Sequence, residues 1–397
     1  MKVKFFFTVL LALSSIVAQS QIVTIPDPNF KSALIDEGVD TNNDGEIQVS
    51  EAEAISQLSV SDYNISSLVG IESFINIQQL SCENNMLTSL DVSQNTSLQT
   101  LWCRFNMITT LDVTGCTQLA TLICTDNQIS TIDLSFNPNL YWMDLSFNEL
   151  VSLDVTQNPA LNLFICLENN LTNLDLTQNT NLDRVFLNNN QLTQLDVSNS
   201  PGITQLFCSE NQLSSLDVSQ NPILSNLGCF GNSITHLDLT QNPEISSLSC
   251  ENNQLESLDL RNGNNSGILR MFAIGNPNLL CIQVDDVSFA NAQICDMTGD
   301  GSGWCKDGIA EYSKICELGV EDLRDISFSL VPNPTGNLLQ ISTDLEVQGV
   351  VIYSANGTKV LELPATDLLD LSSLASGLYF AQVVSVSGIS TQKFIKY

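Results

Sequence analysis

The sequence is dominated by a 21-residue unit that is repeated nine times without a gap over residues 77–265. The first unit reads IQQLSCENNMLTSLDVSQNTS. Two polar columns persist in every unit at intervals of 21 residues, an asparagine from Asn85 to Asn253 and an aspartate from Asp91 to Asp259. A strict period of this length predicts a solenoid, in which each unit forms one coil and stacks on its neighbours.

Each unit contains two half-coils, LxxLxCxxNxL followed by LDVSxN. Apolar residues alternate at positions 80 and 82 and again at 90 and 92, which predicts a short strand on each side of every coil. The half-coil is too short for both a turn and a helix, so we expect a mainly β, flattened solenoid with about 4.8 Å per coil. The asparagine columns are expected to bond to backbone groups at the bends.

The nine units resemble the leucine-rich repeat family, specifically its short bacterial class with 21 residues per turn. The resemblance covers about half of the chain and is specific, because nine consecutive units obey the pattern. It implies that the outward positions of the first strand, at 79, 81 and 83 in the first unit, form a concave face.

Function is expected where the repeats differ, and they differ most on this face. The central coils place large apolar residues and two arginines there, whereas the end coils return to residues such as Gln79 and Ser249. Aromatic residues with arginine inside a polar rim are typical of a binding surface. The predicted ligand-binding residues are Trp102, Arg104, Ile123, Trp142, Asp144, Ile165, Arg184, Phe186, Phe207 and Phe230, with Leu163 and Leu167 on the same face. Two alternatives remain open: exposed aromatics without function, and a C-terminal domain that covers the patch.

Seven cysteines occupy one inward column: Cys82, Cys103, Cys124, Cys166, Cys208, Cys229 and Cys250. Leu145 and Leu187 fill the two remaining steps, and leucine can replace neither a metal ligand nor a disulfide partner. We therefore expect buried reduced thiols that fill core space. Cys116 stands in the column of Asn95 as a substitution.

The nine aspartates could form a cation-binding ladder. We favour instead hydrogen bonds to neighbouring Ser, Thr and backbone groups, because no second ligand column accompanies them.

Ahead of the repeats, the pattern predicts a helix over 28–38, a twelve-residue loop over 40–51 and a second helix over 51–58 capped by Ser50 and Glu53. The loop matches an EF-hand at its diagnostic positions, including Gly45 at the sharp turn and Ile47 pointing inward. The predicted structural Ca²⁺ ligands are Asp40, Asn42, Asp44, Glu46, Gln48 and Glu51. The alternative is a solvated acidic turn.

After the ninth repeat, residues 275–286 resemble the closing unit of this repeat class, and a cap with three more cysteines follows. Four cysteines allow three pairings. We favour the nested one, Cys281 with Cys316 and Cys295 with Cys305, because the shorter loop looks like an insertion in the longer one.

The two ends of the chain carry targeting signals. Lys2 and Lys4, an apolar run and Ala18-Gln19-Ser20 predict a secretory signal peptide over 1–20. From residue 326 the landmarks VPNPT, YSANG, LASGLYF and KFIKY resemble the C-terminal sorting domain of type IX secretion substrates. That resemblance implies an immunoglobulin-like β-sandwich, export across the outer membrane of a Bacteroidota-type bacterium, and either release or surface attachment.

The expected organisation is a signal peptide (1–20), an N-terminal cap (21–76), nine repeats (77–265), a closing repeat and cap (266–317), a linker (318–325) and the sorting domain (326–397). No apolar run beyond the signal peptide reaches the length of a transmembrane helix. The net charge of −31 argues against nucleic acid as a partner.

The predicted function is an extracellular or cell-surface binding or adhesion protein that recognises a protein or glycan through the concave face. The alternative is a structural envelope or matrix protein without a specific ligand. An enzyme is disfavoured, because the chain has neither HExxH nor GxSxG and its single histidine, His236, lies outside the first strand.

Overall fold

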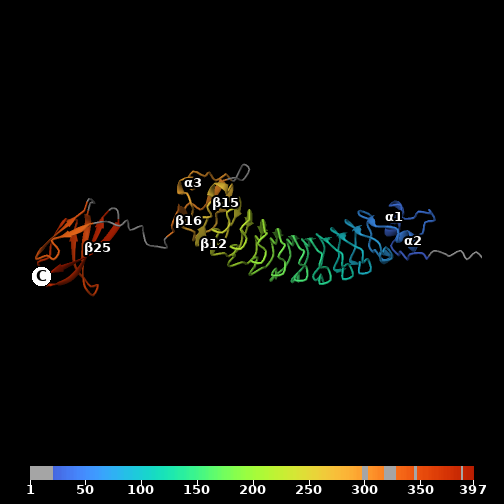
Figure 1. Ribbon diagram of the computed structural model, residues 1–397, viewed down its shortest axis with the longest axis horizontal. Coiled ribbons are helices and arrows are strands. Elements are labelled where there is room, and N and C mark those ends of the chain that lie inside the picture. Colours follow the sequence, from blue (N-terminus) through green and yellow to red (C-terminus); the bar gives the residue numbers. More distant parts are fainter. Residues whose placement is uncertain (1–20, 297–302, 317–327, 344–346, 386–387) are drawn as a thin grey trace, which may run out of the picture. The chain divides into compact units, whose positions relative to one another are not determined.

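The computed structural model describes residues 21–296, 303–316, 328–343, 347–385 and 388–397. It divides into two compact units, Met1–Cys316 and Glu317–Tyr397, each with its own hydrophobic core (Figure 1). The predicted signal peptide and linker lie outside the described residues. None of the helices in the described ranges combines the length and apolar character needed to span a bilayer.

The first unit begins with a small helical cap. Helix α1 (Pro28–Asp36) starts at Asp27, whose carboxylate accepts N–H groups of the first turn and also those of Ser66 and Ser67. Helix α2 (Val49–Ala52) is shorter than predicted and starts earlier, because Glu51 returns to the backbone of Gln48 and closes the capping box there. The chain then extends into the first strand of the solenoid.

One parallel sheet of 12 strands runs along the whole stack and follows the chain order of the coils (Figure 1). Neighbouring repeat strands pair in register 21 residues apart, as Leu80 does with Leu101. The strands are β1 (Gln57–Ser59), β2 (Gln79–Ser81), β4 (Thr100–Trp102), β6 (Thr121–Ile123), β7 (Trp142–Asp144), β8 (Leu163–Ile165), β9 (Arg184–Phe186), β10 (Gln205–Phe207), β11 (Asn226–Gly228), β13 (Ser247–Ser249), β15 (Arg270–Ala273) and β17 (Gly303–Lys306).

The opposite side of the stack is paired only near its ends, so the prediction of a strand on both sides of every coil is wrong for the central coils. Strand β3 (Ser89–Asp91) pairs with β5 (Thr110–Asp112), and a second parallel sheet contains β12 (His236–Asp238), β14 (Ser257–Asp259), β16 (Cys281–Gln283) and β18 (Glu311–Ser313). Between these sheets a hollow of ≈ 700 Å³ separates three coils, lined by residues that include Leu174, Leu195 and Asp217.

The spacing between coils explains why the central coils lack second-side pairing, since the residue types on this side hardly change along the stack. The continuous sheet holds its coils at the ladder distance of about 4.8 Å. A stack that bends toward this sheet opens on the other side, which places the 12-stranded sheet on the concave side (Figure 1).

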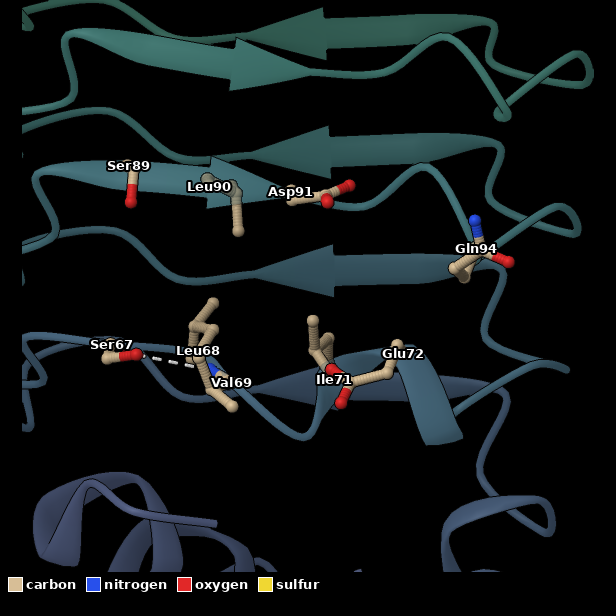
Figure 2. A pocket seen from close by; sticks show the side chains of 9 residues that line it. All are labelled: Ser67, Leu68, Val69, Ile71, Glu72, Ser89, Leu90, Asp91 and Gln94. Atoms are coloured by element: carbon tan, nitrogen blue, oxygen red, sulfur yellow. Dashed lines mark hydrogen bonds between the residues drawn. The ribbon is translucent and has the colours of Figure 1, made fainter. Parts of the chain in front are cut away.

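A smaller hollow of ≈ 310 Å³ marks the irregular first coil. There Leu68 and Val69 lie across from Leu90 of β3 without forming a strand, and the 3₁₀ turn η1 (Ile71–Ser73) follows them (Figure 2). Glu72 accepts the N–H of Gly70 at 2.8 Å, which fixes this local turn.

The interior of the stack consists of the apolar columns and the cysteine column. All seven column cysteines, and Cys116, are buried free thiols. Burial raises the pKa of the Cys208 thiol to about 12, because the thiolate would lose its hydration. The cysteines therefore behave as small apolar residues, as predicted.

Two asparagine columns close the bends. In the first, Asn211 donates from Nδ2 to the carbonyls of Leu187 and Cys208 and accepts the Leu192 N–H at Oδ1, at 3.0–3.1 Å. In the second, Asn137 donates to the carbonyls of Val113 and Cys116. The side chains thus link consecutive coils where the backbone cannot bond to itself.

The aspartate column also has the predicted structural role. Each aspartate from Asp91 to Asp259 accepts the backbone N–H two residues later at 2.8–3.0 Å. The hydroxyl and N–H of Thr156 lower the pKa of Asp154.

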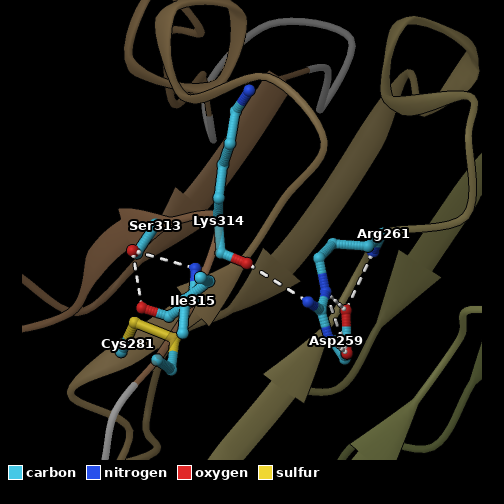
Figure 3. Close-up of a disulfide and its surroundings, with 7 residues drawn as sticks. Asp259, Arg261, Cys281, Ser313, Lys314 and Ile315 are labelled. Atoms are coloured by element: carbon cyan, nitrogen blue, oxygen red, sulfur yellow. Dashed lines mark hydrogen bonds and ion pairs between the residues drawn. A yellow bond between two sulfur atoms is a disulfide. The ribbon is translucent and has the colours of Figure 1, made fainter.

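The C-terminal cap contains η2 (Asn265–Gly267) and α3 (Val287–Asn291) and is tied by two disulfides. The structure pairs Cys281 with Cys316 and Cys295 with Cys305, which is the nested arrangement. Beside the first disulfide, the guanidinium of Arg261 binds Asp259 and donates to the carbonyl of Lys314 (Figure 3). The last coil is therefore held to the solenoid by a disulfide and by a hydrogen bond from Arg261.

The second unit is an antiparallel sandwich. One sheet contains β19 (Ser329–Val331), β20 (Leu338–Ser342) and β23 (Leu368–Asp370), and the other contains β22 (Lys359–Pro364), β21 (Val347–Ser354), β24 (Gly377–Ser385) and β25 (Gly388–Lys396). Alternating residues of both sheets, including Leu339, Val350 and Phe394, share one buried core.

Candidate recognition surface

The outer face of the 12-stranded sheet displays the side chains that flank each buried central residue. In strand β4, Leu101 is buried while Thr100 and Trp102 are partly exposed, and the other repeat strands follow the same rule except β11, where Gly228 is also buried. Nine of the residues singled out from the sequence lie in these strands, namely Trp102, Ile123, Trp142, Asp144, Leu163, Ile165, Arg184, Phe186 and Phe207. Arg104, Leu167 and Phe230 follow their strands by two residues.

The structure brings five of the predicted residues together in one hollow of ≈ 480 Å³ on this face. The hollow spans four consecutive coils and is open to solvent. Its walls are two indoles, one isoleucine, one phenylalanine and four polar side chains: Trp102, Trp142, Ile123, Phe105, Glu83, Arg104, Thr125 and Asp144. We call this feature the tryptophan hollow.

The charged side chains of the tryptophan hollow differ in whether they already have a partner of opposite charge. Arg104 is engaged by Glu83, with Nε 2.6 Å from the carboxylate, and its guanidinium lies 5.6 Å from the centre of the Phe105 ring. Asp144 accepts only the N–H of Ser146 among the hydrogen bonds described for its side chain. The hollow therefore offers apolar surface together with a carboxylate that can meet a donor or a cation.

Three of the remaining predicted residues, Arg184, Phe186 and Phe207, lie in the neighbouring strands β9 and β10 farther along the stack. The rings of Phe186 and Phe207 are stacked with centres 5.3 Å apart and an angle of 6° between the planes. A Cβ at Gly228 would lie 2.6 Å from the Phe207 ring, so glycine is required for the ring to lie over β11. Arg184 lies beside Asp183 at 3.6 Å. Both rings are half-buried.

Sequence reasoning missed a row of exposed apolar residues in the turn that follows each strand of this sheet. Phe105 and Phe147 are 45% and 47% exposed, and Met86 and Met107 are 44% and 41% exposed. The sequence contained a signal for them, since other coils have Asn, Asp, Glu or Gly in the column of Phe105. These columns lie outside positions 79, 81 and 83 of the unit, to which the predicted concave face is limited.

The loop 40–51 has the backbone of an EF-hand-like turn. Gly45 has a positive φ of 80° and donates its N–H to Asp40, while Asn42 accepts the N–H of Asp44. Asp40 and Glu51 are both buried at 7% exposure.

The donor set of this loop is all oxygen, with carboxylates and amide carbonyls, which suits Ca²⁺. In the structure, these groups bond to one another. Asn42 donates to Gln48, Gln48 donates to Asp44, and Glu51 accepts the N–H groups of Thr41 and Gln48. The side chain of Glu46 pairs with Lys31 at 2.7 Å. The residues thus fit the ion in kind, and the amide side chains must turn to present their oxygens to it.

Within the described ranges, loop 40–51 included, no cluster of three or more His, Cys, Asp or Glu side chains is arranged to hold a metal ion. His236 lies in β12 on the side opposite the tryptophan hollow, where it is exposed and bonds to Ser257 at 2.8 Å.

Comparisons with known proteins identify the parts of the chain. The model of the secretion system C-terminal sorting domain matches residues 329–397. No curated protein has significant sequence similarity to the chain.

Many solved structures have a similar fold, among them the following three. The functional domain of InlJ from Listeria monocytogenes, described as including a cysteine ladder, is 21% identical, with 95% of this chain and 98% of that chain covered and a TM-score of 0.53. A TDR receptor is 18% identical, with coverage of 57% and 44% and a TM-score of 0.50. An internalin, InlF from Listeria monocytogenes, is 19% identical, with coverage of 68% and 95% and a TM-score of 0.44.

Proposed function

We propose that this chain, which folds as a leucine-rich-repeat solenoid and ends in a secretion sorting domain, is a secreted or cell-surface binding protein. It recognises a protein or a glycan through its 12-stranded sheet. The sorting domain indicates export, so the solenoid works outside the cell or at its surface. The observation that carries the proposal is the tryptophan hollow, where Trp102, Trp142 and Ile123 expose apolar surface beside Asp144. Catalysis is not part of the proposal.

The test is a binding screen of residues 21–397 against arrayed glycans and purified envelope and host proteins. A double variant, Trp102→Ala with Trp142→Ala, should lose at least tenfold in affinity, because central aromatic residues supply most of the binding free energy of such surfaces. Its melting temperature should stay close to that of the unchanged chain, since both side chains lie on the outer face.

Phe136→Gln is the matched control. Phe136 is an exposed aromatic residue (54%) in a turn outside the 12-stranded sheet, where other coils have Gln94 or Gln157. Binding that persists in the tryptophan double variant would refute the proposal. Silence across the screen would favour the purely structural role.

We further propose that loop 40–51 binds Ca²⁺ and rigidifies the N-terminal cap. Support comes from the oxygen donor set and from the position of the loop, which connects α1 to α2 at the first coil. An isolated extracellular site of this type has a Kd of about 0.1–1 mM. Saturation at about 10 mM Ca²⁺ then stabilises the fold by about 1.4–2.7 kcal/mol.

Thermal unfolding with and without Ca²⁺ measures this effect. Ca²⁺ should raise the melting temperature of the unchanged chain and leave that of Asp44→Ala unaffected. Asp62→Asn removes one exposed carboxylate outside the loop and should keep the Ca²⁺ response. An equal response to Mg²⁺ at the same concentration, or none to Ca²⁺, would count against a calcium site.

A further inference from the structure

The turn after each strand of the 12-stranded sheet contains a residue in the left-handed backbone region. Five coils fill it with residue types that tolerate this conformation, namely Asn84, Asp126, Asn189, Gly231 and Asn252, and two coils have Glu168 and Glu210 there. Two coils instead have phenylalanine there, Phe105 with φ 56° and Phe147 with φ 54°. For a bulky residue a positive φ is an outlier, and each instance costs about 1–3 kcal/mol.

Packing does not compensate for this strain. Both rings are close to half exposed, and the contact described for Phe105 is with the neighbouring Arg104 guanidinium. An asparagine at either position would remove both the strain and the exposed apolar surface. Residues that are strained and exposed together are typical of functional sites rather than of structural positions.

The two phenylalanines lie in the same row of turns as two exposed methionines, and Asp126 stands in the coil between Phe105 and Phe147. Met86 and Met107 lie two residues after the left-handed position of their coils and are also exposed. We call Met86, Phe105, Met107 and Phe147 the hydrophobic ridge. It adjoins the tryptophan hollow, because Phe105 lines both. In the C-terminal coils the same columns carry polar residues such as Glu210 and Gln212, so the ridge is confined to the coils of the hollow.

The chemistry of the ridge distinguishes between two classes of ligand. Glycans bind through flat aromatic platforms combined with polar groups that meet their hydroxyls. Methionine side chains offer flexible apolar surface without a hydrogen-bond donor, which suits irregular apolar protein surfaces. The combination of Met, Phe and Trp therefore favours a protein.

The charges around the hollow indicate which sign of charge the partner carries. The hollow and its surroundings contain Glu83, Asp126, Asp144 and Glu149, whereas the nearby Arg104 is already paired with Glu83. The net charge of the chain is −31, which attracts cationic surfaces over a longer range.

We propose that the hydrophobic ridge and the tryptophan hollow together form the docking site for a protein segment that presents apolar side chains next to lysine or arginine. This inference rests on the proposed function and adds the class of partner and the ridge to it. A lysine or arginine of the partner enters the hollow, where Trp102 and Trp142 offer aromatic faces and Asp144 a carboxylate. The apolar side chains of the partner cover Phe105 and Phe147.

The experiment uses random peptides displayed on phage, selected on residues 21–397, together with a glycan array. The selected peptides are synthesised and titrated against the unchanged chain, the double variant Phe105→Asn with Phe147→Asn, and the control Phe136→Gln. Asparagine already occupies the left-handed position in other coils, so the double variant should fold and melt at the same or a higher temperature.

The inference predicts peptides that combine lysine or arginine with aromatic or aliphatic residues. Their affinity should fall at least tenfold in the asparagine variant, stay unchanged in Phe136→Gln, and weaken as the salt concentration rises. Failure to select peptides, selection of peptides without basic residues, or equal affinity for the asparagine variant would overturn it. Glycan binding that requires Trp102 and Trp142 but not the ridge would also overturn it, while leaving the proposed function intact.

Discussion

Each buried asparagine of the first column supplies hydrogen bonds that the backbone of its tight bend cannot make. Asn211 satisfies two carbonyls of its own coil, that of Leu187 on the preceding coil, and the N–H of Leu192. Because the side chain is only 8% exposed, water cannot replace these bonds.

We predict that Asn211→Ala lowers the free energy of unfolding by about 3 kcal/mol, since it leaves several buried backbone groups without partners. Asn173→Ala is the matched control. Asn173 is exposed and bonds only to the adjacent Thr172 hydroxyl, so its loss should cost less than about 0.5 kcal/mol. Urea unfolding followed by circular dichroism compares the two, and equal destabilisation would contradict the assigned role.

The roles of the buried residues could be predicted from the sequence. The roles of the exposed residues could be predicted only in part. The repeat period identified the asparagine, aspartate and cysteine columns correctly, because identical neighbours force identical environments. The period could not show that Phe186 and Phe207 stack on each other, or that Gly228 makes room for them. Those contacts depend on side-chain angles on an open surface, which no repeating pattern constrains.

At the scale of single elements, the 12-stranded sheet follows directly from the sequence, whereas the partial loss of the second sheet does not. The motif LDVS or LDLT is present in the central coils that lack a second strand, as at Leu174 and Leu195. Local sequence therefore allows the strand, and the separation of the coils on that side prevents its pairing. Curvature is a property of the whole stack and is not encoded in any one repeat.

The cysteine column gives a prediction about pH. The pKa of Cys208 is raised from 9.0 to about 12 by burial, so the folded state holds its proton more tightly than the unfolded state does. The resulting contribution to stability is complete below pH 9 and is lost as the pH rises from about 9 to about 12.

Urea unfolding at pH 8 and at higher pH should show a falling free energy of unfolding, by about 1 kcal/mol per pH unit above 9 for each such thiol. In Cys208→Ala the fall should be shallower by that amount. In native protein at pH 8 the eight buried thiols should not react with a thiol reagent, and they should react after unfolding. A rapidly reacting thiol in the native chain would show that the column is accessible.

At the scale of the whole molecule, the chain combines an acidic solenoid with a separately folded sorting domain. The sequence predicted both parts, because a strict repeat and an ordered set of landmarks are long-range patterns. Its 44 acidic residues outnumber its 13 basic ones, and the three arginines of the repeats, Arg104, Arg184 and Arg261, lie beside Glu83, Asp183 and Asp259. The solenoid therefore has little positive charge with which to bind an anionic partner, which agrees with the proposal of a basic partner.

The two units have separate cores, so we predict that they unfold independently. All three tryptophans, Trp102, Trp142 and Trp304, belong to the first unit, and the sorting domain has none. Tryptophan fluorescence therefore reports unfolding of the solenoid alone, whereas circular dichroism reports both units.

Phe394→Ala removes a fully buried ring from the sandwich core and should destabilise that unit by about 3–5 kcal/mol. The dichroism transition of the sandwich should move to lower temperature while the fluorescence transition stays in place. A parallel shift of both signals would show that the stability of the solenoid depends on the sorting domain.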